Sequence, residues 1–284
     1  MVPFVPAPRL KDAFRAIPMW WRSFAYLKQH GLRQYHASGP AVIVGLAIAG
    51  VAFSHWLTEQ LKTSFRRAVT GWLPTDNSSG AWWDEALLWG SSKADWLIEW
   101  GVVLFVLWLK VKVTKYLLIT LMAPLMSALA AAVGKVETGM DMPFSWKTLV
   151  RDLLRGLRIS MVLLFLELAL GAALWMTGLI LTLFTGPLVV LLTPALLMAS
   201  WLVGAYFFGA AVYDAVYEQG GLDWKASLRA GWQQRGHLVG LGAVFSLIMA
   251  IPFVGPYLAA LLGPVPCTTA AARLFFSPTS PSRP

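Results

Sequence analysis

Long apolar runs without charged residues divide this chain into segments of membrane length. The first run covers residues 34–58, and a second apolar helix is predicted over residues 100–134. A helix needs ~20 apolar residues to cross a ~30 Å hydrocarbon core, so each run is long enough to span a bilayer. The pattern therefore predicts two long transmembrane helices within residues 34–134.

Two later apolar stretches each contain a Gly-Pro pair and are predicted to form helical hairpins. The first covers residues 159–216 and breaks at Gly186-Pro187, and the second covers residues 236–276 and breaks near Gly255-Pro256. Two full crossings need ~40 residues and a turn, which the first hairpin can just provide. The second is shorter, so we expect a hairpin that only partly penetrates the bilayer.

The ends of the chain are polar or amphipathic. Residues 1–33 form a basic N-terminal segment, in which positions 18–30 (PMWWRSFAYLKQH) predict an interfacial helix that begins at Pro18. Helical spacing places Trp21 and Leu27 near one face of this helix. The last residues, 277–284, are rich in Ser and Pro and are predicted to be a disordered tail.

A basic amphipathic segment over residues 135–158 leads into the first hairpin. Its cations recur at spacings of four, four and three residues, which places them on one face of a helix. Anionic lipid headgroups are one partner for such a stripe, and a soluble anion attracted electrostatically is another. The four cations are Lys147, Arg151, Arg155 and Arg158.

Composition assigns the chain to the membrane proteins. Hydrophobic residues make up 57% of the sequence and charged residues only 13%, whereas about a quarter of the residues in a soluble domain are charged. The formal net charge is +9, but the apolar runs leave too little soluble chain for a nucleic-acid-binding domain. We therefore expect a lipid bilayer as a partner and no nucleic acid.

The distribution of Lys and Arg predicts the orientation in the membrane. Residues 1–33 carry six basic residues against one acid, whereas residues 62–95 carry four of each. Because basic residues favour the cytoplasmic side, we expect a cytoplasmic N-terminus and an outer loop over residues 62–95.

No pattern of residues points to catalysis, a cofactor or a metal. The sequence has one cysteine, Cys267, and contains no HExxH, GxSxG or phosphate-binding loop. We therefore expect no catalytic residues, no cofactor and no metal ligands.

Charged residues inside or beside the apolar runs are better candidates for a functional role, because charge is costly there. Lys112 and Lys115 share a helix face and either line a pore or extend to the membrane surface. Glu167 is either a gate or one member of a structural ion pair. Asp214 is the first charge after a long apolar stretch and is expected to mark the return to the cytoplasmic interface.

The stretch HGLRQY at positions 30–35 contains a candidate anion site. Glycine permits unusual backbone angles, so the N–H groups of Gly31, Leu32 and Arg33 can point to one spot. The Arg33 guanidinium adds a planar set of donors, and a helix that begins near Ser38 brings the positive end of its dipole. The alternative is that Arg33 only anchors the cytoplasmic end of the next helix.

Several of these stretches together resemble the CysZ sulfate-permease family, which shares a domain with the etoposide-induced membrane proteins. They are the GLRQY turn, YLLITLMAPLMSALAAAV, AYFFGAAVYDAVYEQGGLDWKASLR and GLGAVFSLIMAIPFVGPYLAALLGPVPCTTAAA. The resemblance runs from about Phe14 to Phe276 and implies a single domain over residues 1–276. It also implies a bacterial inner-membrane protein with two long transmembrane helices and partly penetrating hairpins.

The resemblance further implies a permease that takes up sulfate, or a related oxyanion, for cysteine synthesis. Two features differ from the family pattern. Gln34 stands where the family has a second basic residue, and Ala131 and Gly134 stand where glutamates are common. A non-transporting membrane scaffold of the same domain family therefore stays an alternative, and a homo-oligomer stays open. The anion site implied by the resemblance is Gly31, Leu32, Arg33 and Gln34.

Overall fold

The computed structural model of the chain describes residues 11–37, 56, 59–60, 63, 82–139, 146–185, 188–251 and 254–276. The chain divides into two compact units, residues 1–43 with 115–284, and residues 44–114. Most of the first predicted spanning helix, residues 34–58, lies outside the described residues, as does the tail, residues 277–284. The contacts reported below lie in the first unit unless stated otherwise.

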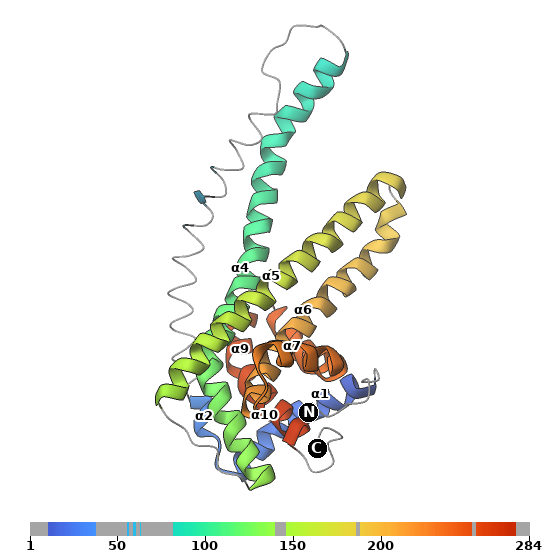
Figure 1. Cartoon of the computed structure of the whole chain (residues 1–284). Helices are drawn as coiled ribbons and strands as arrows, with labels where there is room; N and C mark the ends of the chain where they lie inside the picture. Colours follow the sequence, from blue (N-terminus) through green and yellow to red (C-terminus); the bar gives the residue numbers. More distant parts are fainter. Residues whose placement is uncertain are drawn as a thin grey trace. The chain divides into compact units, whose positions relative to one another are not determined.

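All the elements of secondary structure over the described residues are helices (Figure 1). The all-α fold class predicted from the apolar runs is therefore confirmed. The helices are α1 (Lys11–Gln29), α2 (Gln34–Ala37), α4 (Trp82–Thr138), α5 (Trp146–Thr185), α6 (Val189–Gln219), α7 (Trp224–Gln233), α8 (Arg235–Met249), α9 (Gly255–Leu262) and α10 (Pro264–Phe276).

Four helical segments among the described residues are long and apolar enough to cross a membrane. One belongs to α4, one to each arm of the first hairpin, and one to the pair α9 and α10. This result agrees with an integral membrane protein. The segments are Lys112–Thr138, Val150–Leu181, Val190–Gln219 and Tyr257–Phe276.

The first hairpin consists of α5 and α6, which run side by side away from the other helices of the first unit (Figure 1). α5 is continuous from Trp146, so the basic stripe and the first apolar arm are parts of one helix. The chain reverses between Thr185 and Val189, and Gly186 and Pro187 themselves lie outside the described residues.

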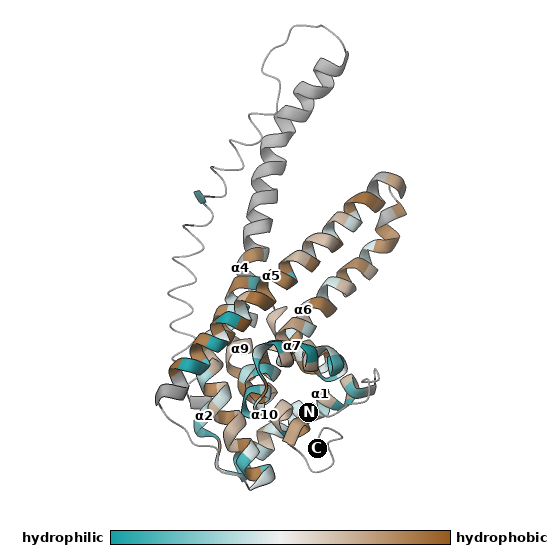
Figure 2. Ribbon diagram, in the orientation of Figure 1, coloured by the Kyte–Doolittle hydropathy of each residue, from teal (hydrophilic) through white to brown (hydrophobic). Residues whose placement is uncertain are grey.

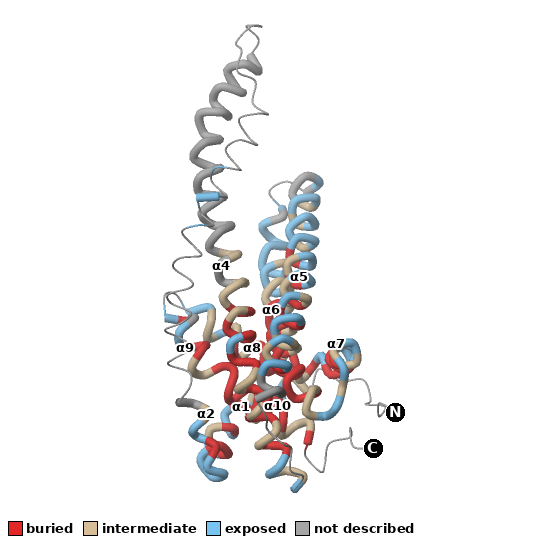
Figure 3. The backbone as a smooth tube through the Cα atoms, turned by 60° about the vertical axis from the view of Figure 1, so that its left-hand side comes forward, coloured by how far each residue is buried: buried red, intermediate tan, exposed pale blue. Residues whose placement is uncertain are grey.

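The far part of the hairpin consists largely of hydrophobic residues (Figure 2), and most of the residues there are exposed (Figure 3). Trp175, Phe184 and Leu191 are 77%, 85% and 77% exposed. A water-soluble protein rarely exposes a continuous apolar surface of this kind. Lipid is therefore the solvent that this surface fits.

The second hairpin is shorter than the first. α8 has 15 residues, which corresponds to a rise of ~22 Å, less than the ~30 Å of a hydrocarbon core. Gly255 and Pro256 begin α9, and Gly263 separates α9 from α10. The first arm is thus shorter than a membrane span, whereas α9 and α10 together are long enough to cross, so the depth of this hairpin stays a prediction.

The core of the first unit forms where α6 crosses α8 (buried residues in Figure 3). The two backbones come close because Gly209 lies against the Leu238 carbonyl and Gly242 against the Ala205 carbonyl. The rings of Phe208 and Phe245 stack beside this crossing, with centroids 3.5 Å apart. Small residues at helix crossings are typical of membrane bundles, where close packing replaces the hydrophobic effect.

Helix α1 differs from the predicted interfacial helix in its start and its face. It begins at Lys11, so Pro18 lies inside the helix and not at its first position. The residues before Pro18 stay helical because they pack on α8, where Ala13 contacts Gly240. Trp21 and Leu27 were expected near one face of this helix, but Leu27 is buried in the core whereas Trp21 is 67% exposed.

Helix α7 begins with a side-chain cap. Asp223 precedes the helix in an extended conformation, and its Oδ1 accepts a hydrogen bond of 2.7 Å from the Ala226 N–H. We expect Asp223→Ala to lower the free energy of unfolding by about 1 kcal/mol, because this N–H loses its partner. Thermal unfolding in detergent measures the loss. Asp223→Asn should retain most of the stability, and equal stability of the Ala variant would contradict a capping role.

Candidate functional site

The turn that follows α1 is held by backbone hydrogen bonds. The N–H of His30 donates to the Tyr26 carbonyl at 3.1 Å, and the N–H of Leu32 donates to the Leu27 carbonyl at 2.9 Å. Gly31 lies between them with φ of 70°, a left-handed angle that favours glycine. This combination is the Schellman motif, which terminates a helix at a glycine.

The turn differs from the predicted nest of N–H groups. The Leu32 N–H is already bonded to Leu27, so it is not available to an anion, and the Leu32 side chain is buried. The side chains of Arg33 and Gln34 are exposed, and Arg33 forms no ion pair with any described residue. The helix expected near Ser38 lies outside the described residues. Arg33 is therefore the main donor that the turn presents.

An aromatic and ionic contact connects this turn to two other helices. The Tyr26 ring lies 4.3 Å from the His30 ring and 4.4 Å from the Arg273 guanidinium. Arg273, on α10, is also 3.4 Å from a carboxylate oxygen of Glu137, near the end of α4. Burial, together with the negative charge of Glu137, raises the pKa of Tyr26, so its hydroxyl stays protonated at neutral pH. These contacts fix the end of α1 from which Arg33 projects.

Lys115 and Glu167 form a buried ion pair between α4 and α5. The Lys115 Nζ and the Tyr116 hydroxyl both donate to Glu167 Oε2. Nζ also lies 3.5 Å from the Gly204 carbonyl of α6. The side chains of Lys115 and Glu167 are only 7% and 1% exposed. Lys115 therefore does not extend to the membrane surface, which was one of its two predicted roles.

Lys112 has a different environment, within the second compact unit. Its Nζ lies 5.7 Å from the centroid of the Trp108 ring, one helical turn earlier on α4. The side chain is half-buried. The pore role of Lys112 stays a prediction.

Arg155 is the centre of a second buried cluster. Its Nε and Nη2 donate to the two oxygens of Asp214 at 3.2 and 2.9 Å. Nη1 donates to the Leu222 carbonyl and Nη2 to the Ser227 hydroxyl, each at 2.9 Å. Asp214 is thus buried and paired, and its expected place at the cytoplasmic interface stays a prediction.

These bonds use all three nitrogens of the Arg155 guanidinium. Arg155 therefore cannot attract a soluble anion, which corrects its predicted place in the basic stripe. Of the other members, Arg151 and Arg158 are exposed, and the Arg158 guanidinium lies 4.3 Å from the centroid of the Trp224 ring. Lys147 begins α5, but its side chain lies outside the described residues.

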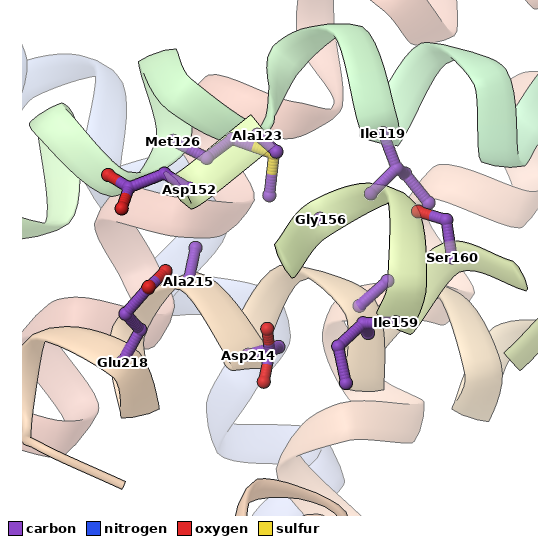
Figure 4. Close-up of a pocket in the computed structure, with 11 residues that line it drawn as sticks. Ile119, Ala123, Met126, Asp152, Gly156, Ile159, Ser160, Asp214, Ala215 and Glu218 are labelled. Carbon is purple, nitrogen blue, oxygen red and sulfur yellow. The ribbon is translucent and has the colours of Figure 1, made fainter. Parts of the chain in front are cut away.

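A small cavity beside Arg155 has carboxylates in its wall (Figure 4). Its volume is about 20 Å³, which is room for a single water molecule. The carboxylates of Asp152, Asp214 and Glu218 border it, and Asp152 Oδ1 makes no hydrogen bond to a described residue. A tetrahedral oxyanion is larger than this space and is repelled by the carboxylates. The cavity is therefore not the anion site.

The described residues contain no group of three or more His, Cys, Asp or Glu side chains that could hold a metal ion. Among the described residues of the first unit, Lys115 and Arg155 are ion-paired, whereas Arg33 is exposed.

Comparison with known proteins connects this arrangement to a transport family. Residues 19–266 match the family described as Sulfate transporter CysZ/Etoposide-induced protein 2.4. The chain belongs to this family. A search of the curated proteins finds no match.

Within the CysZ-type domain, the turn with Arg33 lies inside the matched residues, and so do both buried clusters. The clusters contain two residues that the sequence did not single out, Tyr116 and Ser227. Glu137, on the same helix as Ala131 and Gly134, was also not predicted, nor was Arg273, which follows the matched residues. One signal could have found Glu137 and Arg273, because each is a charge near the end of an apolar helix.

Proposed function

We propose that this chain is a membrane permease for sulfate or a related inorganic oxyanion. The match to the sulfate-transporter family over residues 19–266 carries the proposal. Support also comes from Arg33, an exposed cation on a rigid turn. We place the protein in the inner membrane of a bacterium with a cytoplasmic N-terminus, where the imported oxyanion would supply cysteine synthesis.

In this proposal Arg33 binds the oxyanion at the mouth of the path. Its planar guanidinium can donate two parallel hydrogen bonds to a tetrahedral oxyanion, and the Gln34 amide adds a neutral donor. Gly31 sets the direction of the turn, and the Leu32 side chain attaches it to the core. Arg151 and Arg158 raise the local anion concentration, an effect that falls as salt screens the charges.

The buried pair of Lys115 and Glu167 is proposed as a closed gate. While Glu167 neutralises Lys115, the pair offers no free positive charge to an anion. Movement of the carboxylate away from Nζ would expose a cation inside the bundle. Transport would then depend on opening this pair.

The first test is uptake of radiolabelled sulfate into proteoliposomes that contain the full chain. Arg33→Ala should raise the apparent KM for sulfate by about 10- to 100-fold, because a charged donor is lost. Thermal stability should be unchanged, since Arg33 is exposed and forms no ion pair with the described residues.

Two variants serve as controls for this experiment. Arg22→Ala removes another exposed cation, from α1, and should leave uptake within about twofold of normal. Arg33→Lys retains the charge without the planar donors and should give an intermediate KM. If the unmutated chain carries no sulfate while a known permease works in parallel, the alternative of a non-transporting membrane scaffold replaces the proposal.

A further inference from the structure

Helix α7 has a buried face and a cationic face. Ser227, Ala230 and Gly231 are buried against the bundle. At 100° per residue, Lys225, Arg229 and Trp232 lie on the opposite side of the helix, and all three are exposed. We call this surface, together with the exposed Arg235 that begins α8, the α7 face.

The cations of the α7 face lie among aromatic rings. The Arg235 guanidinium is 5.6 Å from the centroid of Trp232, and Lys225 Nζ is 5.5 Å from that of Trp224. Trp232 is 63% exposed, although a large apolar ring gains little from water. Asp223, which caps α7, is one exposed acid against the three exposed cations Lys225, Arg229 and Arg235. The α7 face therefore carries a net positive charge beside an exposed tryptophan.

The position of α7 in the fold relates this face to the membrane. α7 connects the end of α6 to the start of α8, and so joins the two apolar hairpins. It packs against α6 at the foot of the α5–α6 hairpin and contains hydrophilic residues (Figure 2). Arg158 of α5 stacks on Trp224 at this foot. The α7 face thus lies where an apolar arm gives way to polar surface.

We propose that the α7 face binds the headgroups of anionic phospholipids. Lys and Arg near a bilayer surface attract anionic lipid, and tryptophan favours the interface between headgroups and hydrocarbon. Lys225 and Arg229 lie ~6 Å apart along an exposed helix face that also carries Trp232. The tryptophan beside the cations favours a lipid headgroup over sulfate, because sulfate has no apolar part for the ring to contact. The proposal does not depend on the permease function.

The test measures lipid binding to the detergent-purified full chain by native mass spectrometry. Phosphatidylglycerol should bind at least about fivefold more tightly than phosphatidylcholine. Lys225→Gln with Arg229→Gln should weaken binding of phosphatidylglycerol by about 5- to 30-fold and leave phosphatidylcholine unchanged. Lys225→Arg with Arg229→Lys is the matched control that retains both charges, and its affinity should stay within about twofold of the original.

Two results would overturn the proposal. One is an unchanged affinity for phosphatidylglycerol in the double Gln variant, when thermal unfolding shows that it is folded. The other is a loss of sulfate uptake in the double Gln variant that is equal in liposomes of neutral and of anionic lipid, which would assign the α7 face to attraction of the substrate. If the unmutated chain transports no sulfate, the lipid-binding measurement alone tests the proposal.

Discussion

Glu167→Ala is expected to lower the free energy of unfolding by about 3–5 kcal/mol, because it leaves Lys115 buried without its counter-ion. The side chain of Lys115 is 7% exposed, and its Nζ also lies 3.5 Å from the Gly204 carbonyl and 4.6 Å from the centroid of the Tyr116 ring. Neither of these neutral groups replaces the charge of the carboxylate. Chemical unfolding in mixed micelles measures the loss.

A double-mutant cycle separates the pair from the individual residues. Lys115→Met combined with Glu167→Leu removes both charges and should recover most of the lost stability, since two apolar side chains need no counter-ion. If the loss of unfolding free energy in the double variant equals the sum of the losses in the two single variants, a direct interaction is contradicted. In the permease proposal, the same apolar pair should also abolish sulfate uptake while the protein stays folded.

Gly242→Ala is expected to destabilise the chain by at least about 3 kcal/mol, a large loss for one methyl group. A Cβ at this position would lie 1.7 Å from the Ala205 carbonyl oxygen. Because that atom belongs to the backbone of α6, no side-chain rotation can relieve the overlap, and α6 and α8 must move apart. Size-exclusion chromatography and thermal unfolding should show loss of the folded monodisperse protein.

Gly178→Ala is the matched control for this change. It lies within α5, where an added Cβ would be 3.4 Å from a Leu196 methyl group, an ordinary contact. Alanine is also the better helix former by about 1 kcal/mol. We therefore expect equal or higher stability for this variant. Equal effects of the two substitutions would show that the crossing of α6 and α8 is looser than described.

The helices were predictable from the sequence because their signal is local. An apolar run of membrane length indicates a helix wherever it later packs, so the all-α fold followed from the apolar runs together, and the first hairpin from residues 159–216. The start of α1 was not predictable in this way. Proline favours the first turn of an isolated helix, but packing of Ala13 on Gly240 stabilises the turns before Pro18.

The partners of the charged residues could not be predicted, because they depend on how the helices rotate and cross. Arg155 and Arg158 are equally basic in sequence, yet one is bonded to Asp214 and the other is exposed. By contrast, the hydrogen bond that makes the Leu32 N–H unavailable to an anion was predictable. A glycine just after a helix often terminates it with such a bond from the following N–H, and the GLRQ turn contains this glycine.

The continuity of α5 has a mechanical consequence. α5 is one unbroken helix of 40 residues and is ~60 Å long. One end carries the exposed apolar residues that fit lipid, and the other end is bonded to α6 and α7 through Arg155. A bilayer that is thicker or thinner than the apolar part of α5 would tilt this helix. The strain would fall on the two bonded anchors of this helix, first on the pair of Glu167 and Lys115 and then on the bonds between Arg155 and Asp214.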